Sequence, residues 1–276
     1  MSESDSPAAV ELSREAASRV IVELLTACSV FEVDAEVAAE AMLWGEQVGR
    51  PGDGLALLPS IVEQITSGVI DPRGRPLVMC DSPAIQTIDG SSGVGPVAAA
   101  MAVGWLAEAA RTSGTATVLV KGGRDLGDPA WIVHKLGEQG LVGVCVTAVM
   151  RETPMIRAAA ASAGVEDEGR PAVRWEGPPS PLVEAVISGL TGGRAVTLKA
   201  DAPNPAVCEH VIVAYEPETV GGSGRLGAKL SQMPEGVCEY LPTSLAETVL
   251  LSRETAAAVR RLAEERGVSA GELAAG

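Results

Sequence analysis

Two aspartates in glycine-containing loops are the residues of this sequence best suited to chemistry. Asp53 lies within Gly-Asp-Gly, and Asp125 follows Arg124 shortly before the helix-start signal Asp128-Pro129. A carboxylate in a loop can transfer protons, and a neighbouring arginine can bind an anion or an oxyanion. Both aspartates also have an ordinary interpretation as turn residues, which leaves the choice open at this point.

Lys121 and His134 are further candidates close to Asp125 in the sequence. Lys121 shares its loop and could bind an anionic group, or it could be a solvated charge. His134 lies on the helix after the loop, three residues beyond Trp131, where it could be catalytic, partly buried or at an interface. Trp105 and Trp131 are interpreted as core or dimer contacts rather than stacking platforms.

The charge balance argues against two classes of partner. The 276 residues include 21 basic and 36 acidic residues, which gives a net charge of −15, and the basic residues form no run or stripe. We therefore expect no nucleic-acid partner and no anionic-membrane partner. A chain of this length can bury a large core in one broad domain or two.

The cysteines and histidines carry no metal-binding signature. The five cysteines are scattered without a Cys-x-x-Cys pair, and His134 and His210 are far apart, so we expect no metal site. Cysteines of this kind fit a reduced, cytoplasmic setting. The acidic, polar N-terminus lacks a secretory pattern, and no apolar run approaches the ~20 residues that span a bilayer.

The element pattern changes along the chain from helical periodicity to short apolar runs between turn signals. A strand, a helix and a strand in succession imply a right-handed crossover in a buried sheet. The predicted helices cover 12–28 with Ser13 as N-cap, the stretch from Asp34 to Gly45 or Gly49, 55–66, 96–112 with Met101, Trp105 and Ala109 on one stripe, the segment after Asp128, 182–190, and the segment after Ser252. The predicted strands cover 77–80, 85–88, 116–120, 142–149, 195–199 and 211–215.

Residues 151–180 are the least regular part of the chain. The alanines at 158–161 favour a helix, and their polar, breaker-rich surroundings indicate a loop or a shortened insertion. We expect an N-terminal helical part at 1–75, a central α/β domain at 76–235, and a C-terminal helical part at 236–276 that packs back on the first.

Three segments in matching order and spacing resemble the malate/L-lactate dehydrogenase family, a non-Rossmann group that includes sulfolactate and ureidoglycolate dehydrogenases. Residues 49–59 and 67–72, GRPGDGLALLP and SGVIDP, are similar to its Ser-His-Gly to Leu-Pro run and its Gly-x-Ile-x-Pro motif. The other matches are 88–96 with its Asp-Gly-x-x-Gly-x-Gly turn, 118–127 with its Asn-His-Phe-Gly loop, 140–143 with its Gly-Leu-Ile-Gly turn, 183–192 with its helix ending in Leu-Thr-Gly, and 210–217 with its Gly-His strand. His210, at the start of that strand, is interpreted as structural.

The resemblance implies a fold, an assembly and an activity. The fold is α/β, with a central mixed sheet, helices packed on it, and a helical domain built from the N-terminal and C-terminal segments. The assembly is a homodimer. The activity is hydride transfer with NAD or NADP, in which two histidines exchange protons with a substrate oxygen.

The sequence departs from the family at each functional part. Asp53 and Asp125 stand where the family has its two active-site histidines, and Leu57 stands where it has a carboxylate-binding arginine. The family's Pro-x-Gly-Gly, Gly-Thr-Asn-Pro, Asp-x-Ala-Thr-Ser and Lys-Gly segments are missing, and too few residues separate Met150 from Leu182 to hold them. We therefore expect that nicotinamide binding is lost and that no cofactor is used.

These departures favour a redirected enzyme that carries out cofactor-independent cyclisation, elimination or isomerisation on a small metabolite, as in secondary-metabolite biosynthesis. The resemblance places Asp53 and Asp125 toward one pocket, where neighbouring carboxylates would divide into an acid and a base. The two alternatives are a non-catalytic dimeric pseudoenzyme or binding partner, and an NAD(P)-dependent oxidoreductase with an altered substrate.

Overall fold

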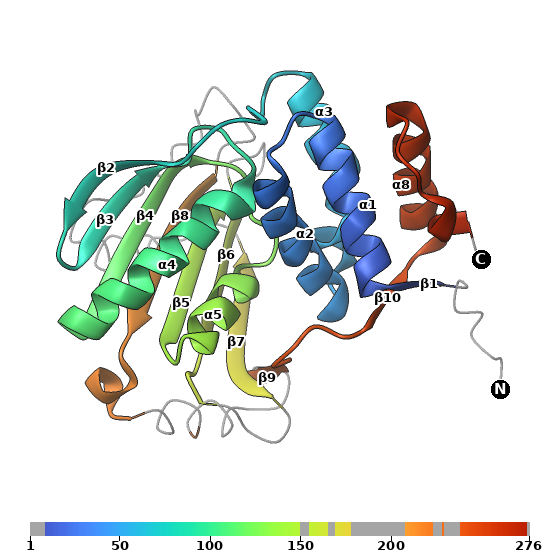
Figure 1. The fold of residues 1–276 in the computed structure, drawn as a ribbon. Helices are drawn as coiled ribbons and strands as arrows, with labels where there is room; N and C mark the ends of the chain where they lie inside the picture. The colour runs from blue at the N-terminus through green and yellow to red at the C-terminus, as the bar shows by residue number, and fades with distance from the viewer. Residues whose placement is uncertain are drawn as a thin grey trace, which may run out of the picture. The chain divides into compact units, whose positions relative to one another are not determined.

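The fold is drawn in Figure 1 from a computed structural model, which describes residues 9–149, 155–164, 169–177, 208–222, 228 and 238–274. The chain divides into two compact units. The helical unit contains Met1–Arg73 and Ser244–Gly276, and the sheet unit contains Gly74–Thr243. The predicted fold class, a mixed α/β sheet together with a helical domain built from both ends of the chain, is confirmed.

The helical unit joins the two ends of the chain by a short strand pair. β1 (Val10–Ser13) pairs antiparallel with β10 (Thr248–Leu251), so Leu12 is in a strand and not in the predicted helix. Ser13 then caps the first helix as predicted, because its hydroxyl oxygen accepts from the Ala16 amide at 3.1 Å. The helices are α1 (Arg14–Ala27), α2 (Glu32–Gln47), α3 (Leu58–Thr66) and α8 (Arg253–Arg266), with 3₁₀ turns η1 (Pro51–Asp53), η2 (Leu55–Leu57) and η4 (Gly271–Ala274).

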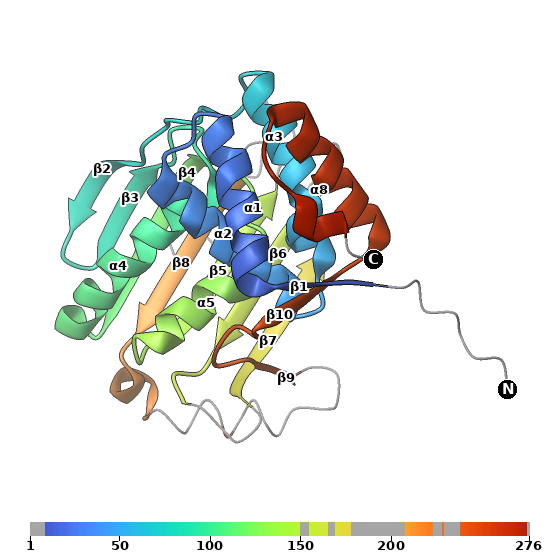
Figure 2. The ribbon, with the colours of Figure 1, turned by 45° about the vertical axis from the view of Figure 1, so that its right-hand side comes forward.

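The sheet unit is built on eight strands in the order β2-β3-β4-β8-β5-β6-β7-β9. Only the β3–β4 pair is parallel among the described strands. The helices α4 (Gly95–Ser113) and α5 (Pro129–Glu138) cover one face of this sheet, as Figures 1 and 2 show. The strands are β2 (Leu77–Ser82), β3 (Ile85–Asp89), β4 (Thr115–Gly123), β5 (Val142–Val149), β6 (Met155–Ala161), β7 (Arg170–Gly177), β8 (Cys208–Tyr215) and β9 (Cys238–Leu241), and the 3₁₀ turn η3 (Pro217–Val220) follows β8.

One sequence prediction about the sheet unit is wrong. Residues 158–161 form part of β6 and not a helix, because pairing with β5 and β7 outweighs the weak helical preference of alanine. The predicted crossover agrees with the strand directions, since β4 and β5 are both antiparallel to β8, which lies between them, and are therefore parallel to each other with α5 in their connection. On α4 the predicted stripe lies partly in solvent, because Met101 is 37% exposed, and the buried residues of the helix include Ala99, Ala102, Leu106 and Ala110.

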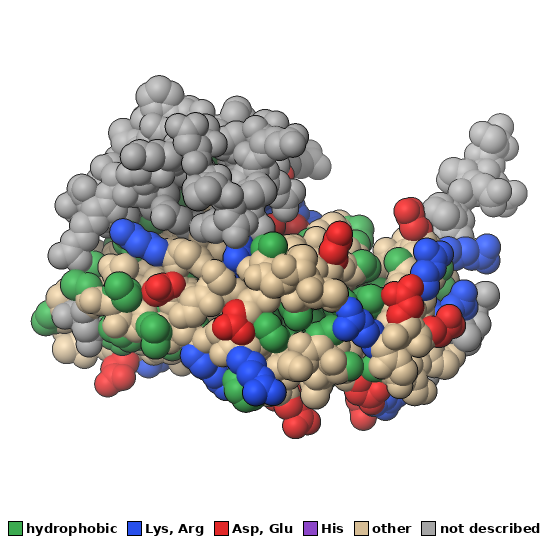
Figure 3. All heavy atoms as spheres, turned by 90° about the horizontal axis from the view of Figure 1, so that it is seen from above, with side chains coloured by type: hydrophobic (Ala, Val, Ile, Leu, Met, Phe, Trp, Pro, Cys, Tyr) green, Lys and Arg blue, Asp and Glu red, His purple; other side chains and the backbone are tan. Residues whose placement is uncertain are grey.

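Two predicted elements cannot be compared with the structure. The helix predicted at 182–190 and the strand at 195–199 lie outside the described residues. On the face drawn in Figure 3, acidic and basic side chains of the described residues are interspersed. Within the described part of the chain, every helix is too short or too polar to cross a membrane.

Candidate active site

The loop from β4 to α5 in the sheet unit holds Asp125 in a tight turn. An Asp125 carboxylate oxygen accepts from the Gly127 amide at 3.0 Å, and Gly127 has a positive φ of 81° that favours glycine. The loop ends at Asp128, whose side chain caps α5 by accepting from the Ala130 amide at 3.0 Å. On its other side the loop touches the start of α4, because an added Cβ at Gly95 would overlap the Asp125 carbonyl. Both neighbouring helices therefore fix the loop.

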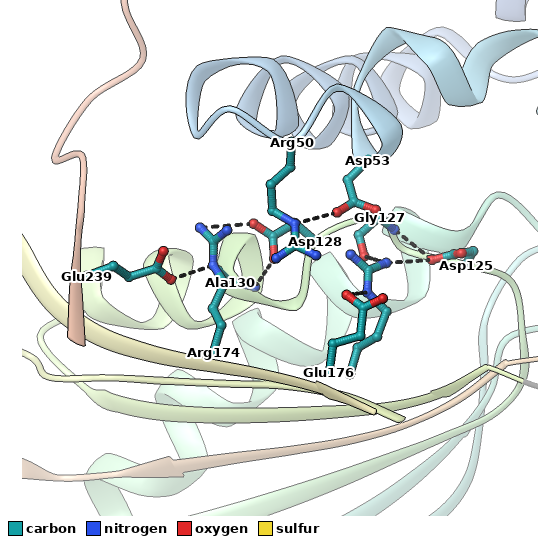
Figure 4. Close-up of polar contacts among 10 residues, drawn as sticks. Arg50, Asp53, Asp125, Gly127, Asp128, Ala130, Arg174, Glu176 and Glu239 are labelled. Carbon is teal, nitrogen blue, oxygen red and sulfur yellow. Dashed lines mark hydrogen bonds and ion pairs between the residues drawn. The ribbon is translucent and has the colours of Figure 1, made fainter. Parts of the chain in front are cut away.

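Arg157 on β6 is the cation that faces Asp125. Its Nη1 donates to the Gly127 carbonyl at 2.8 Å and lies 3.8 Å from the Asp125 carboxylate, while its Nε lies 3.6 Å from Glu176 on β7. Figure 4 labels these three partners. The Arg157 side chain is only 8% exposed, whereas that of Asp125 is 23% exposed. A buried guanidinium needs such acceptors, and these contacts hold the Asp125 carboxylate in place.

A second buried ion pair anchors the end of the same loop. Arg174 on β7 lies 3.2 Å from the Asp128 carboxylate and also contacts Glu239 on β9, as Figure 4 shows. The Asp128 side chain is 1% exposed, so its negative charge is balanced both by Arg174 and by the amide dipoles at the start of α5. Two arginines from neighbouring strands thus hold one loop.

A row of polar residues crosses the sheet beneath the loop. His210 on β8 pairs in register with Thr147 on β5, which pairs with Arg157 on β6, which in turn pairs with Glu176. The two His210 ring nitrogens lie 3.0 Å from the Thr147 hydroxyl and 3.1 Å from the Arg124 carbonyl. A carbonyl only accepts, so Nε2 carries the proton and Nδ1 accepts from Thr147. His210 therefore ties the loop residue before Asp125 to the sheet.

Burial makes three of the groups around this row unreactive. It lowers the pKa of His210 to about 4, against the smaller effect of the Arg124 carbonyl, so the imidazole is neutral near neutral pH. Burial also raises the pKa of the Cys145 thiol to about 12, which excludes it as a thiolate nucleophile. Arg124 is 3% exposed, and burial lowers the pKa of its guanidinium.

The remaining predicted residues of the sheet unit lie away from these contacts. His134 is buried on α5, six residues after the Asp128 cap, and its Nε2 lies 3.4 Å from the Glu138 carboxylate. Lys121 is exposed near the end of β4, where its backbone carbonyl accepts from the Gly90 amide at 2.7 Å. Arg124 thus adjoins Asp125 in the same loop, whereas His134 and Lys121 have other partners.

Asp53 belongs to the helical unit, where it lies in η1. One of its carboxylate oxygens accepts from Arg50 Nε at 3.0 Å, and its side chain is 13% exposed. The backbone of Asp53 packs against Gly45 of α2, where an added Cβ would overlap it. Asp53, like Asp125, is held next to an arginine in its own unit.

Glu46 at the end of α2 supports the same turn in the helical unit. Its carboxylate accepts from the Leu55 amide at 2.7 Å and leaves no space for a side chain at Gly54. Burial raises the pKa of Glu46 to about 7, with the Leu55 hydrogen bond as a smaller opposing effect. The carboxylate therefore titrates near neutral pH.

Comparison with known proteins identifies the family to which this chain belongs. The family model for malate/L-lactate dehydrogenase matches residues 12–166, more than half of the chain. The chain belongs to the malate/L-lactate dehydrogenase family. A malate dehydrogenase of Pyrococcus abyssi is 26% identical over 138 residues, which are 50% of this chain and 38% of that protein. An L-sulfolactate dehydrogenase of Methanocaldococcus jannaschii is 24% identical over 136 residues, 49% of this chain and 40% of that protein.

Solved structures agree on the fold over a longer span. A malate dehydrogenase from Pyrococcus horikoshii OT3 matches with a TM-score of 0.74 at 16% identity, over 98% of this chain and 99% of that one. A delta1-piperideine-2-carboxylate reductase from Pseudomonas syringae pvar. tomato matches with a TM-score of 0.67 at 17% identity, over 91% and 99%. The sequence matches to the curated malate and sulfolactate dehydrogenases span only about two fifths of their length, so these similarities establish family and fold.

Sequence reasoning missed the residues that hold the loop. The segment predicted as a helix and a loop contains Arg157, Arg174 and Glu176. Residues 173–176, Val-Arg-Trp-Glu, nevertheless alternate between apolar and charged side chains as a strand does. The sequence signal that could have identified these residues is a single charged residue within an apolar stretch. Such a charge on a buried strand needs a partner.

His210 predicts a specific loss of stability in acid. Its pKa is about 4 in the folded chain and about 6.5 when unfolded, so the unfolded state gains a proton first and stability falls from about pH 6.5 to 4. Between about pH 7 and 5 this amounts to about 2 kcal/mol. Urea unfolding followed by tryptophan fluorescence should show that His210→Gln loses this part of the pH dependence, whereas the control His134→Gln keeps it. Equal pH dependence in wild type and His210→Gln would contradict the assignment.

Glu46 predicts an opposite pH dependence. Its raised pKa means that the folded state keeps the proton longer, so its contribution to stability is full below about pH 4.5 and is lost as pH rises through about 7. Glu46→Gln keeps the acceptor for Leu55 without a charge. We expect it to be about 1–2 kcal/mol more stable than wild type near pH 8, after allowance for partial solvation, and about equal near pH 5. Denaturant titrations with exposed Glu23→Gln as control check this, and a variant that is less stable at both pH values would count against it.

Proposed function

We propose that this chain is an enzyme on the malate/L-lactate dehydrogenase fold in which Asp125 acts as a general base, without hydride transfer, on a small oxo acid. The observation that carries the proposal is the set of contacts around Asp125, which fix its carboxylate while leaving it partly exposed. A base held by a backbone amide and a buried arginine is preorganised to accept a proton. Enolisation by such a base is the first step of many isomerisations, eliminations and cyclisations.

The substrate class follows from the relatives and from the missing arginine. The relatives are named for malate and sulfolactate, which are small hydroxy acids whose oxidised forms are oxo acids. Leu57 replaces the family's carboxylate-binding arginine, and Arg157 is already engaged by Gly127, Asp125 and Glu176. We therefore propose that a bidentate pair between an arginine and the substrate carboxylate contributes less to substrate binding here than in other members of the family.

Nicotinamide binding is the property that separates this proposal from a conventional dehydrogenase. Because the family's cofactor segments are missing, we expect no saturable change in NADH or NADPH fluorescence when the protein is titrated into either cofactor. The Pyrococcus horikoshii malate dehydrogenase is the positive control. Saturable binding with a dissociation constant below about 100 µM, about −5.5 kcal/mol, would restore the NAD(P)-dependent oxidoreductase reading.

Proton abstraction can be measured without knowing the final product. In D₂O, wild-type protein should exchange the protons α to the ketone of pyruvate, oxaloacetate or 2-oxoglutarate, as followed by proton NMR. Asp125→Asn should lower the exchange rate by about 10²-fold or more, because the amide cannot accept the proton. Asp71→Asn is the matched control, since Asp71 makes the same two-residue turn contact, to Arg73 at 2.9 Å, on an exposed loop.

The exchange assay, together with the cofactor titration, distinguishes the three functional hypotheses. Absence of exchange in wild type, or equal exchange in Asp125→Asn, would contradict the proposal and favour the dimeric pseudoenzyme. Asp53→Asn reports separately on whether Asp53 supplies a second proton-transfer group, as the resemblance implies. A homodimeric assembly and a cytoplasmic location remain part of the proposal.

A further inference from the structure

The helical unit contains a groove unrelated to the residues discussed above. It has a volume of about 610 Å³ and lies between α1, α2 and the chain at 245–247. Its apolar lining comes from Val22, Leu43 and Leu245. A volume of this size lies within the usual range of small-molecule sites.

The charged lining of the groove has both signs in unequal number. Two arginines and four glutamates line it, namely Arg14, Arg19, Glu15, Glu36, Glu40 and Glu247. The acidic side therefore exceeds the basic side by two charges. A ligand that complements this lining carries a net positive charge and at least two cationic groups.

Arg14 adds a cation to the wall of the groove. Its backbone amide donates to the Glu247 carbonyl at 2.8 Å, which fixes its place at the wall of the groove. Its Nε is buried and has no hydrogen-bond partner among the described residues. This Nε is closed off from the groove, but Arg14 lines the groove and is only half-buried, so its guanidinium is a cation with which a ligand carboxylate can pair.

We infer that this groove binds a free basic amino acid, of the lysine or arginine type. The ligand carboxylate meets Arg14, its two cationic groups meet the surplus glutamates, and its methylene chain lies on Val22, Leu43 and Leu245. Each part of such a ligand thus has a complement of matching chemistry. None of Asp53, Arg50 or Asp125 lines the groove, so the inference stands or falls independently of the proposed function.

Isothermal titration of the full chain with L-lysine and L-arginine at low salt tests the inference. We expect saturable binding with a dissociation constant below about 1 mM, weakened by added salt because the contacts are partly exposed ion pairs. L-norleucine lacks the side-chain ammonium and cadaverine lacks the carboxylate, so each should bind at least about 10-fold more weakly.

Variants locate the binding in the groove. The double variant Glu36→Gln with Glu247→Gln changes two exposed side chains and should weaken L-lysine and cadaverine alike, with folding checked by circular dichroism. Arg14→Gln should weaken binding of L-lysine without weakening that of cadaverine, and Glu23→Gln on α1 outside the groove should change neither. Non-saturable titrations, equal affinity for L-lysine and norleucine, or affinities unaffected by the groove variants would each overturn the inference.

Discussion

The buried guanidinium of Arg157 is the interaction on which the candidate site depends. Moving a cation out of water costs several kcal/mol unless acceptors surround it, and Arg157 has the Gly127 carbonyl and the carboxylates of Asp125 and Glu176 within 3.8 Å. The dependence is mutual. The Asp125 carboxylate of the loop offsets the cost of burying the Arg157 guanidinium in the sheet unit. Arg157 in turn holds the Asp125 carboxylate in one place.

The sheet order explains why these groups meet. β8 lies between β4 and β5, so His210 is placed opposite Thr147 and beneath the loop that follows β4. The antiparallel pairs on the far side of β5 then bring Arg157 and Glu176 into the same row. Directly opposed residues share a face, and this face is the one on which α5 packs, so the row and the loop converge at the start of that helix.

Local patterns predicted the elements whose signals lie within a few residues of each other. Ser13 and Asp128 were recognisable as helix caps because an N-cap side chain bonds an amide only two or three residues on, and Ser252 proves to cap the helix predicted after it. The position of β8 was not recognisable, since its partners β4 and β5 lie more than 50 residues before it. The strand character of β6 was not recognisable either, because pairing with β5 and β7 decides it rather than its own alanine-rich sequence. Arg157 was missed for the same reason, although Asp125, its partner, was identified from the family motif. No local rule connects these two residues before the strand order is known.

Aspartate in place of histidine changes what the surrounding structure must supply. A neutral imidazole can be buried with only hydrogen bonds, as His210 is, whereas a carboxylate that loses water needs a cation or several N–H donors. Each of the two aspartates has such a cation in its own unit, Arg50 for Asp53 and Arg157 for Asp125. A loop in which the histidine was replaced by an uncharged residue would need neither Arg50 nor Arg157 as a partner. The matched arginines therefore give each carboxylate the partner that its loss of water requires, within its own unit.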